Sequence, residues 1–258
     1  LPAFTSLVYL FLYAPILVLI IFSFNTSRLN ATWQGFTLAW YGKLFQDHVI
    51  LEATRNSLWV AFISTLVSTA LGTATALGMH RFRFWGKAAV EALLYIPIVI
   101  PEIVMGVSLL AFYVLIGLRL GLTTIVIAHI AFSISFVVVV VRARLHGFDH
   151  SLEEAAMDLG ANPWATFRRV TLPLIMPGVA AGGMMAFTLS LDDFIITFFA
   201  AGPGSTTLPL RIYSMVKTAV TPEVNALSTV ILIFTLTLII LAERLQSSVT
   251  RGGGGPPG

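Results

Sequence analysis

Long apolar stretches separated by short polar segments dominate this chain. A helix needs about 20 apolar residues to cross the roughly 30 Å of hydrocarbon in a bilayer. Runs of Val and Ile would suggest strands in a soluble protein, but they must be helical in lipid, where the backbone satisfies its own hydrogen bonds. The pattern therefore predicts six spanning helices, at about 7–24, 57–79, 88–118, 122–141, 174–201 and 224–242.

Two segments depart from a plain span. The third apolar segment is too long for one straight crossing and contains Pro97 and Pro101, so we expect a kinked helix beside a cavity. Between the first two spans, Phe36–Asp47 has aromatic residues at helical spacing. It is predicted to be a short interfacial helix on the outer surface, with Trp33 and Trp40 at headgroup level.

Composition supports an integral membrane protein. Hydrophobic residues make up 57% of the 258 residues and charged residues only 10%, with a mean hydropathy of +0.90. Soluble domains carry about 25% charged residues, so too little polar surface is present to cover one. The absence of cysteine excludes disulfides and thiolate metal sites. We expect an all-α transmembrane domain at 1–246, surrounded by lipid and without a nucleic-acid partner, and a flexible tail at 247–258.

The distribution of Lys and Arg predicts the orientation of the chain. Cytosolic loops of membrane proteins are enriched in basic residues. Two loops on the same predicted side are strongly basic, so we expect that side and both termini to be cytosolic. The residues are Arg81, Arg83 and Lys87 in the first loop and Arg142, Arg144, Arg168 and Arg169 in the second.

The polar segment between the fourth and fifth spans contains helix start and stop signals. Ser151 and Glu154 have the spacing of a capping box. Gly160 stands where a helix would end through a left-handed residue. Asn162-Pro163 is typical of a new helix start, and Pro173 is expected to end that helix. Two short helices outside the membrane are therefore predicted.

These two helices offer a surface that a partner could contact. Ala155 and Ala156 are small enough to let another backbone approach closely, and Trp164, Phe167 and Val170 form an apolar stripe at helical spacing. The same residues would also suit a loop that only caps and packs itself. The residues alone leave both interpretations open.

A longer pattern resembles a known family. Glu154-Ala155-Ala156, three residues, Gly160, nine residues and then Val170-Thr171-Leu172-Pro173 is similar to the EAA loop of ABC importer permeases, E-A-A-x₃-G-x₉-I-x-L-P, with Val170 in place of Ile. The resemblance implies a type I permease fold in which the loop at 145–173 forms a coupling helix seated in a groove of the ATP-binding subunit. It assigns coupling to Glu154, Ala155, Ala156, Gly160, Leu172 and Pro173.

Other segments narrow the resemblance. "LYAPILVLIIFSFN", "FTLSLDDFIITFF" and "LPLRIYSMVK" with "TPEVNALST" look like spermidine/putrescine permeases, and in particular like the second of their two permease subunits. This implies a bacterial inner-membrane protein that pairs with a second permease, two ATPase subunits that hold ATP and Mg, and an external polyamine-binding protein. No G-x-x-x-x-G-K-[ST] pattern occurs, so we expect no nucleotide or other cofactor on this chain and no enzymatic activity.

Four carboxylates fall within or near the predicted spans. Ionisable residues in a membrane helix are costly and are functional candidates by default. Glu102 lies about 21 Å from the cytosolic end of its segment, and Asp192 and Asp193 lie about 27 Å along theirs, at about 1.5 Å per residue. With Glu223, they make the outer half acidic, which would attract a polyamine. Aromatic faces for cation–π contacts are expected from Tyr95, Phe194 and Tyr213.

Other roles for these residues stay open. Asp192 and Asp193 could pair with basic residues of an outer loop or cap backbone amides. Glu223 follows a proline at a helix start, where the helix dipole favours a carboxylate without any substrate. His129 could relay protons or be a hydrogen-bonded structural residue. His146 and His150 have no third partner in the pattern, so no metal site is expected.

Two rival functions remain. One is the same kind of importer with another small substrate, although the acidic outer half disfavours an anion. The other is a stand-alone proton-coupled carrier that uses His129 and the membrane carboxylates. Such a carrier should show inverted repeats and would need no docking loop.

Overall fold

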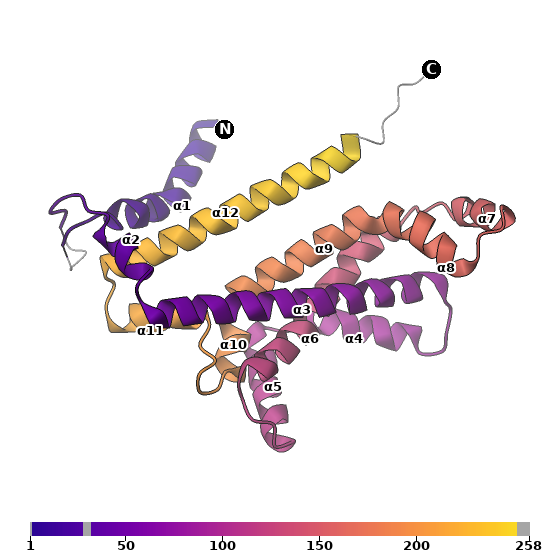
Figure 1. Cartoon of the computed structure of the whole chain (residues 1–258), viewed down its shortest axis with the longest axis horizontal. Coiled ribbons are helices and arrows are strands. Elements are labelled where there is room, and N and C mark those ends of the chain that lie inside the picture. Colours follow the sequence, from indigo (N-terminus) through magenta and orange to yellow (C-terminus); the bar gives the residue numbers. More distant parts are fainter. Residues whose placement is uncertain (1, 28–31, 252–258) are drawn as a thin grey trace. The chain divides into compact units, whose positions relative to one another are not determined.

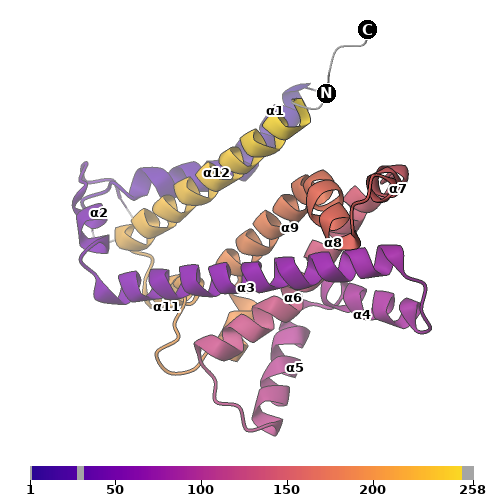
Figure 2. The ribbon, with the colours of Figure 1, turned by 45° about the vertical axis from the view of Figure 1, so that its right-hand side comes forward.

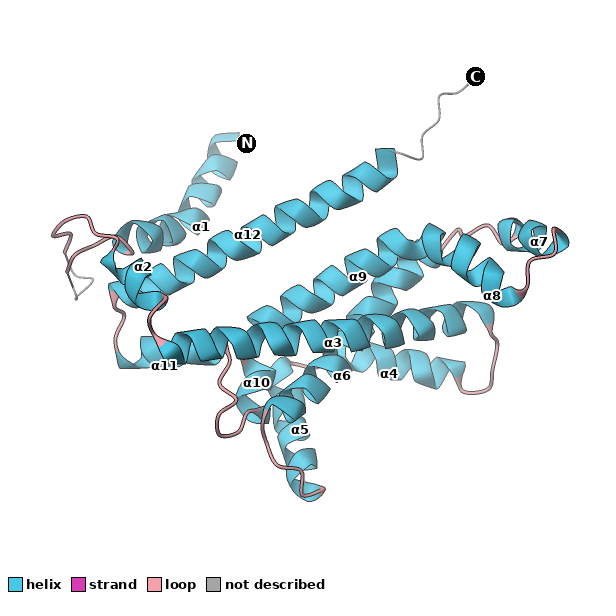
Figure 3. Ribbon diagram, viewed as in Figure 1, coloured by secondary structure: helices cyan, strands magenta, loops and turns pink. Residues whose placement is uncertain are grey.

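The structure is a computed structural model that describes residues 2–27 and 32–251. Within those residues the chain consists of helices joined by loops, with one isolated bridge between Asn25 and Phe36 (Figure 3). The predicted all-α fold is confirmed. The last helix extends to Arg251, into the segment predicted as a flexible tail, and residues 252–258 lie outside the described part.

The described chain divides into two units (Figures 1 and 2). The terminal unit combines residues 1–56 with 206–240, and the central unit contains residues 57–205 and the end of the chain. The terminal unit holds α1 (Pro2–Phe22), α2 (Ala39–Leu44), α11 (Leu208–Thr218) and most of α12 (Pro222–Arg251). Helix α3 (His48–Arg81) starts there and continues into the central unit. The central unit adds α4 (Lys87–Val99), α5 (Glu102–Leu115), α6 (Leu122–Leu145), α7 (Ser151–Asp158), α8 (Pro163–Thr166), η1 (Phe167–Thr171), α9 (Leu172–Asp192) and α10 (Ile195–Ala200).

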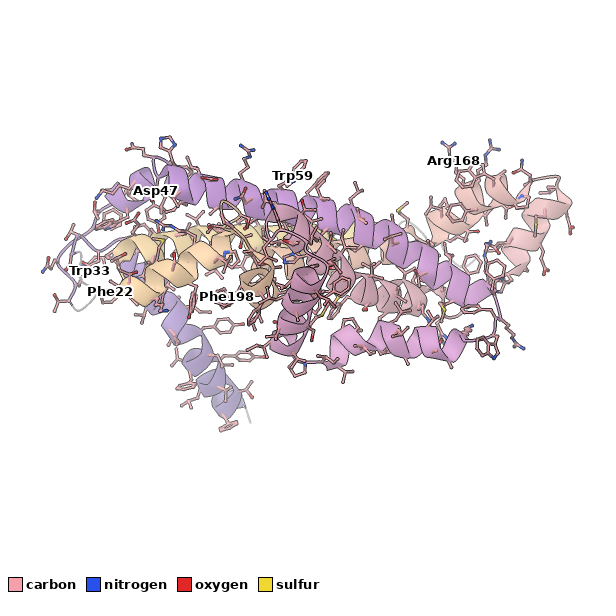
Figure 4. The ribbon with its side chains drawn as sticks, turned by 90° about the horizontal axis from the view of Figure 1, so that it is seen from below. Phe22, Trp33, Asp47, Trp59, Arg168 and Phe198 are labelled. Carbon is pink, nitrogen blue, oxygen red and sulfur yellow. The ribbon has the colours of Figure 1, made fainter. Side chains whose placement is uncertain are left out.

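Trp40 organises the core of the terminal unit. The predicted interfacial helix exists as α2, but Trp40 is buried against Leu208 and Leu227 instead of facing a surface. Its indole N–H donates to the Asn25 carbonyl at 2.8 Å, so the polar end of the ring is satisfied inside the unit. Trp33 is half-exposed, and its ring meets Phe22 edge-on with centroids 6.3 Å apart (Figure 4).

Four described helices are long and apolar enough to cross a membrane, and their ranges differ from the predicted ones. The pair α4 and α5 makes a fifth span if it counts as one broken helix, and Pro222–Thr237 is a shorter apolar helix. The count of six spans therefore stays a prediction. The four helices are Phe4–Phe22, His48–Arg81, Leu122–Leu145 and Pro163–Asp192.

The break between α4 and α5 confirms the predicted kink. The two helices meet at 111°, and Figures 1 and 2 show α5 turning away from α4. Ile100 has the extended backbone (φ −73°, ψ 135°) that a residue before proline prefers, so α4 ends at Val99. Pro101 then precedes the first turn of α5, where its missing N–H is harmless. As a result, Glu102 stands at the start of a helix.

Glycines allow the helices of the central unit to approach α6 closely. A Cβ atom added to Gly178 would lie 2.6 Å from Cβ of Arg144, and one added to Gly182 would lie 3.3 Å from Cγ1 of Val137. A Cβ on Gly72 of α3 would lie 2.7 Å from the same Val137 atom. Gly178 and Gly182 of α9 therefore let that helix pack closely against α6 of the same chain.

The prediction that Pro173 ends the second short helix is wrong. One helix continues from Pro163 to Asp192. The amide of Leu172 donates to the carbonyl of Phe167, five residues back, so the helix widens into a π-turn just before the proline. A proline ring clashes with the carbonyl four residues earlier in a regular α-helix. The wider turn relieves that conflict and lets the helix continue.

Candidate functional site

Helix α7 begins at Ser151, but not through the predicted capping box. Its N-cap residue is His150, which makes no side-chain capping bond. Asp149 instead accepts a hydrogen bond from the Ser151 amide at 2.9 Å. A side-chain hydrogen bond from Ser151, helped by this backbone one, lowers the pKa of Asp149. The helix therefore starts one residue earlier than predicted, so that Glu153 and not Glu154 is its third residue, and Glu154 is exposed.

The end of α7 confirms the predicted glycine stop. Gly160 has a φ of +89°, in the left-handed region. Its amide donates to the Met157 carbonyl at 2.9 Å, and the Ala161 amide donates to the Ala156 carbonyl at 3.0 Å. These two bonds form a Schellman motif, which fixes the direction in which the chain leaves the helix.

The second short helix starts as predicted. The side chain of Asn162 accepts a hydrogen bond from the Ala165 amide at 2.8 Å, and Pro163 occupies the first helical position. Helix α7 packs beside α8 and η1 (Figure 1), and Arg168 points outward from η1 (Figure 4).

Large apolar side chains are exposed around this turn. Leu159 is 90% exposed and Trp164 is 68% exposed. Apolar side chains exposed together next to charged residues make this turn a candidate interaction surface. We call this surface the docking face, made up of Leu152, Glu154, Ala155, Met157, Leu159 and Trp164.

Glu153 attaches the other side of α7 to the helix bundle. We call the contacts of Glu153 with Arg81 and Thr171 the clamp. The Glu153 carboxylate is 11% exposed and accepts hydrogen bonds from Arg81 at the end of α3 and from Thr171 of η1. Arg81 also reaches the Thr171 hydroxyl at 3.3 Å, and Nδ1 of His150 lies 3.6 Å from the carboxylate. Sequence reasoning missed this clamp because it concentrated on Glu154, which projects about 100° away around the helix.

Three of the four predicted membrane carboxylates come together in the central unit. Glu102 starts α5, Asp192 ends α9, and Asp193 lies in the break between α9 and α10. Helix α5, which begins at Glu102, packs against α10, which begins two residues after Asp193. The approach is close because a Cβ on Gly106 of α5 would lie 2.6 Å from the Phe199 ring of α10. We call these three residues the acidic cluster.

Asp193 is held by four hydrogen-bonding groups around its carboxylate. Its Oδ2 accepts hydrogen bonds from the Thr197 amide and hydroxyl, both at 2.7 Å, and lies 3.2 Å from Nε2 of His129. Its Oδ1 accepts from the Ile196 amide at 3.2 Å. A carboxylate oxygen has about two acceptor positions, so the three donors saturate Oδ2, while Oδ1 accepts one hydrogen bond. Within the described residues, the other two carboxylates of the cluster are exposed and make no hydrogen bond or ion pair.

The family comparison decides what kind of protein carries these features. The family model for the binding-protein-dependent transport system inner membrane component matches residues 68–252. The chain belongs to this family. It is therefore an inner-membrane component of a transport system. Members of this family are transport subunits rather than enzymes.

Relatives of this transport component are similar over nearly the whole chain. The spermidine/putrescine transport system permease protein PotC of Shigella flexneri is 44% identical over 252 residues, covering 98% of this chain and 96% of that protein. The putrescine transport system permease protein PotI of Escherichia coli K12 is 44% identical over 229 residues, covering 86% and 82%. The predicted resemblance to polyamine permeases is confirmed.

A solved structure supports the fold of this transport component. A bacterial ABC transporter involved in the import of the acidic polysaccharide alginate has a chain that matches with a TM-score of 0.72. The match covers 95% of this chain and 93% of the other at 20% identity. The chain thus has the fold of an ABC importer permease.

The remaining predicted pathway residues of this transport component are dispersed. Glu223 stands in the first turn of α12 and lines a polar cleft of about 470 Å³ together with Asp47 and Arg211. Nη2 of Arg211 lies 3.9 Å from Oδ2 of Asp47. Glu223 and Tyr213 belong to the terminal unit, so their relation to the acidic cluster stays a prediction. In the central unit, Tyr95 is exposed on α4, and the ring of Phe194 lies 5.8 Å from that of Phe198, measured between centroids.

Proposed function

We propose that this chain is a permease subunit of an ATP-driven bacterial importer and forms half of the membrane pathway for polyamines such as putrescine and spermidine. The observation that carries this proposal is the 44% identity to PotC over 98% of the chain. The match extends over the segments that hold the polar loop and the membrane carboxylates, because it covers 98% of the chain.

The acidic cluster supports a cationic substrate. Glu102 and Asp192 are exposed and carry no partner cation within the described residues. Two separated carboxylates suit the ammonium groups of a polyamine, and a site of low dielectric strengthens the attraction. Aromatic faces such as that of Phe198, which is half-exposed beside the cluster in the sequence, suit the methylene spacers and cation–π contacts. The same charges would repel an anion.

The docking face supports coupling to an ATPase subunit. Its apolar side chains are not buried by other residues of the central unit. Helix α7 has well-defined ends, with a hydrogen bond to Asp149 at its start and the left-handed Gly160 after its end. In the proposed assembly this chain pairs with a second permease, two ATPase subunits bind ATP and Mg, and an external binding protein delivers the polyamine. Both termini lie in the cytosol.

The proposed mechanism is alternating access. ATP binding draws the ATPase subunits together and moves α7, and the clamp at Glu153 passes that movement to α3 through Arg81. The helices then change between inward- and outward-facing arrangements, which form the two states of the pathway. The binding protein releases the polyamine to the acidic cluster in the outward-facing arrangement.

Uptake of labelled putrescine and spermidine into vesicles tests this function. We expect vesicles that contain the complete transporter to accumulate both polyamines only with ATP and the binding protein. Vesicles that contain this chain alone should take up neither polyamine. ATP-independent uptake by the isolated chain would instead identify a stand-alone carrier.

Replacing Gly160 by Ala should weaken coupling to ATP. An added Cβ has no atom within 4 Å, so the effect is limited to the left-handed backbone, which disfavours alanine by about 1 kcal/mol. We expect the number of polyamines transported per ATP hydrolysed to fall about five-fold, because the direction of the docking face is disturbed. Gly160→Asn is the matched control, since Asn tolerates this backbone and should keep a ratio near that of the original protein. The same number of polyamines transported per ATP hydrolysed in the Ala variant and the original protein would contradict docking of an ATPase subunit at this turn.

A further inference from the structure

A buried chain of polar side chains crosses the central unit at the break between α9 and α10. Ser64 of α3 lies 3.0 Å from Ser190 of α9, and Oγ of Ser190 lies 2.7 Å from Nδ1 of His129 in α6. Nε2 of His129 lies 2.9 Å from the Thr197 hydroxyl of α10 and 3.2 Å from the Asp193 carboxylate. Four helices are therefore joined through one imidazole, which is 3% exposed.

These polar side chains stabilise a break in the backbone hydrogen bonding between α9 and α10. Helix α9 ends at Asp192, and Asp193 has an extended backbone (φ −65°, ψ 122°), so the regular helical hydrogen bonds stop there. The carboxylate of Asp193 takes over by accepting the Ile196 and Thr197 amides at the start of α10. Because a carboxylate only accepts, its contact with His129 requires the proton on Nε2. The imidazole thus ties the break to α6.

We propose that His129 is a positioning residue for the polyamine site. It holds Asp193 in the interior of the central unit, and this leaves the neighbouring Asp192 and the facing Glu102 as the two carboxylates that receive ammonium groups. The inference rests on the proposed function and deepens it, because it divides the adjacent aspartates into one that supports the site and one that binds. The side chain of Asp193 is 5% exposed and is surrounded by these donors, so it is assigned to support the site and not to contact the substrate.

Two acidic residues can stand side by side here because one of them, Asp193, is engaged by hydrogen-bond donors. A buried carboxylate without partners is strongly disfavoured, and each hydrogen bond from the backbone, Thr197 and His129 offsets part of that cost. Without the imidazole, Asp193 and Ser190 would each lose a buried partner. The break would then lose the hydrogen bonds that join it to His129 of α6, and the position of Asp192 would be less firmly fixed.

Double-mutant cycles on the complete transporter test the proposal. We expect His129→Ala and Asp193→Asn each to raise the KM for putrescine uptake about ten-fold, and the double variant to be no worse than either alone, because both remove one interaction. Combining His129→Ala with Asp192→Asn should instead multiply the two effects. His129→Gln should regain most of the affinity, since its amide can donate to Asp193. A variant that only lowered the amount of folded transporter would reduce the maximal rate and leave KM unchanged.

A second measurement does not depend on the substrate. The same His129 and Asp193 variants are compared by thermal unfolding of the purified complex without polyamine, and we expect the same lack of additivity in the melting temperatures. The original complex could fail to transport polyamines while the melting temperatures of the His129 and Asp193 variants still lacked additivity. That result would contradict the proposed function but would support the contact between α6 and the break. Effects of His129→Ala and Asp193→Asn that multiply in KM and add in melting temperature would overturn the proposal.

Discussion

Replacing Glu102 by Gln and Asp192 by Asn in the same chain is expected to reduce putrescine uptake at low substrate concentration by about 100-fold or more. Each exposed carboxylate is free to accept a charge-assisted hydrogen bond from an ammonium group, and such bonds contribute about 1.5–3 kcal/mol. Losing two of them corresponds to at least two factors of ten in affinity. Initial uptake rates over a range of putrescine concentrations measure the effect as an increase in KM.

Single variants and a control sharpen this test. Glu102→Gln and Asp192→Asn should each raise KM about ten-fold, since each leaves one carboxylate in place. Glu52→Gln removes an exposed carboxylate of α3 outside the acidic cluster and should leave KM unchanged. A double variant with the KM of the original protein would show that the polyamine does not bind at this cluster.

The second large effect is expected at the clamp behind the docking face. Arg81→Glu or Glu153→Arg alone should lower the uptake per ATP hydrolysed at least ten-fold and reduce the stability of the complex. Breaking a buried ion pair destabilises a protein by about 3–5 kcal/mol, and the 35% exposure of Arg81 reduces this to about 2 kcal/mol. The physical reason for uncoupling is that α7 would then move without displacing α3. Parallel assays of ATP hydrolysis and uptake in proteoliposomes measure the ratio.

A charge swap distinguishes the ion pair from other effects of these substitutions. The variant that carries both Arg81→Glu and Glu153→Arg restores opposite charges and should recover part of the coupling lost in each single variant. Asp158→Asn changes an exposed carboxylate at the end of the same helix and should transport like the original protein. If the swap were no better coupled than the single variants, the transmission would have to run through contacts other than this pair.

Several features of the chain follow from local sequence alone. The apolar runs make helices because a backbone in lipid has to bond to itself. The break before Pro101, the left-handed Gly160 and the cap at Asn162 depend on residues within one turn, and each was predicted correctly. The EAA spacing is likewise local, and it indicates the family without any tertiary contact.

The site depended on contacts that no local pattern contains. Nothing around Asp192 and Asp193 in the sequence distinguishes them, and the difference arises from His129, 64 residues away from its aspartate partner. The importance of Glu153 over its neighbour comes from Arg81, 72 residues earlier in the chain.

The sequence by itself determined that this is a helical inner-membrane permease with a polar loop that contains helix start and stop signals, because hydropathy, turn chemistry and motif spacing are properties of neighbouring residues. Tertiary structure decided which carboxylate is free, which glutamate is clamped and whether Pro173 ends a helix. The physical reason is that a hydrogen bond to a buried carboxylate, or a π-turn that relieves a proline, depends on the side chains and helices packed around it. Those neighbours are brought together only by folding.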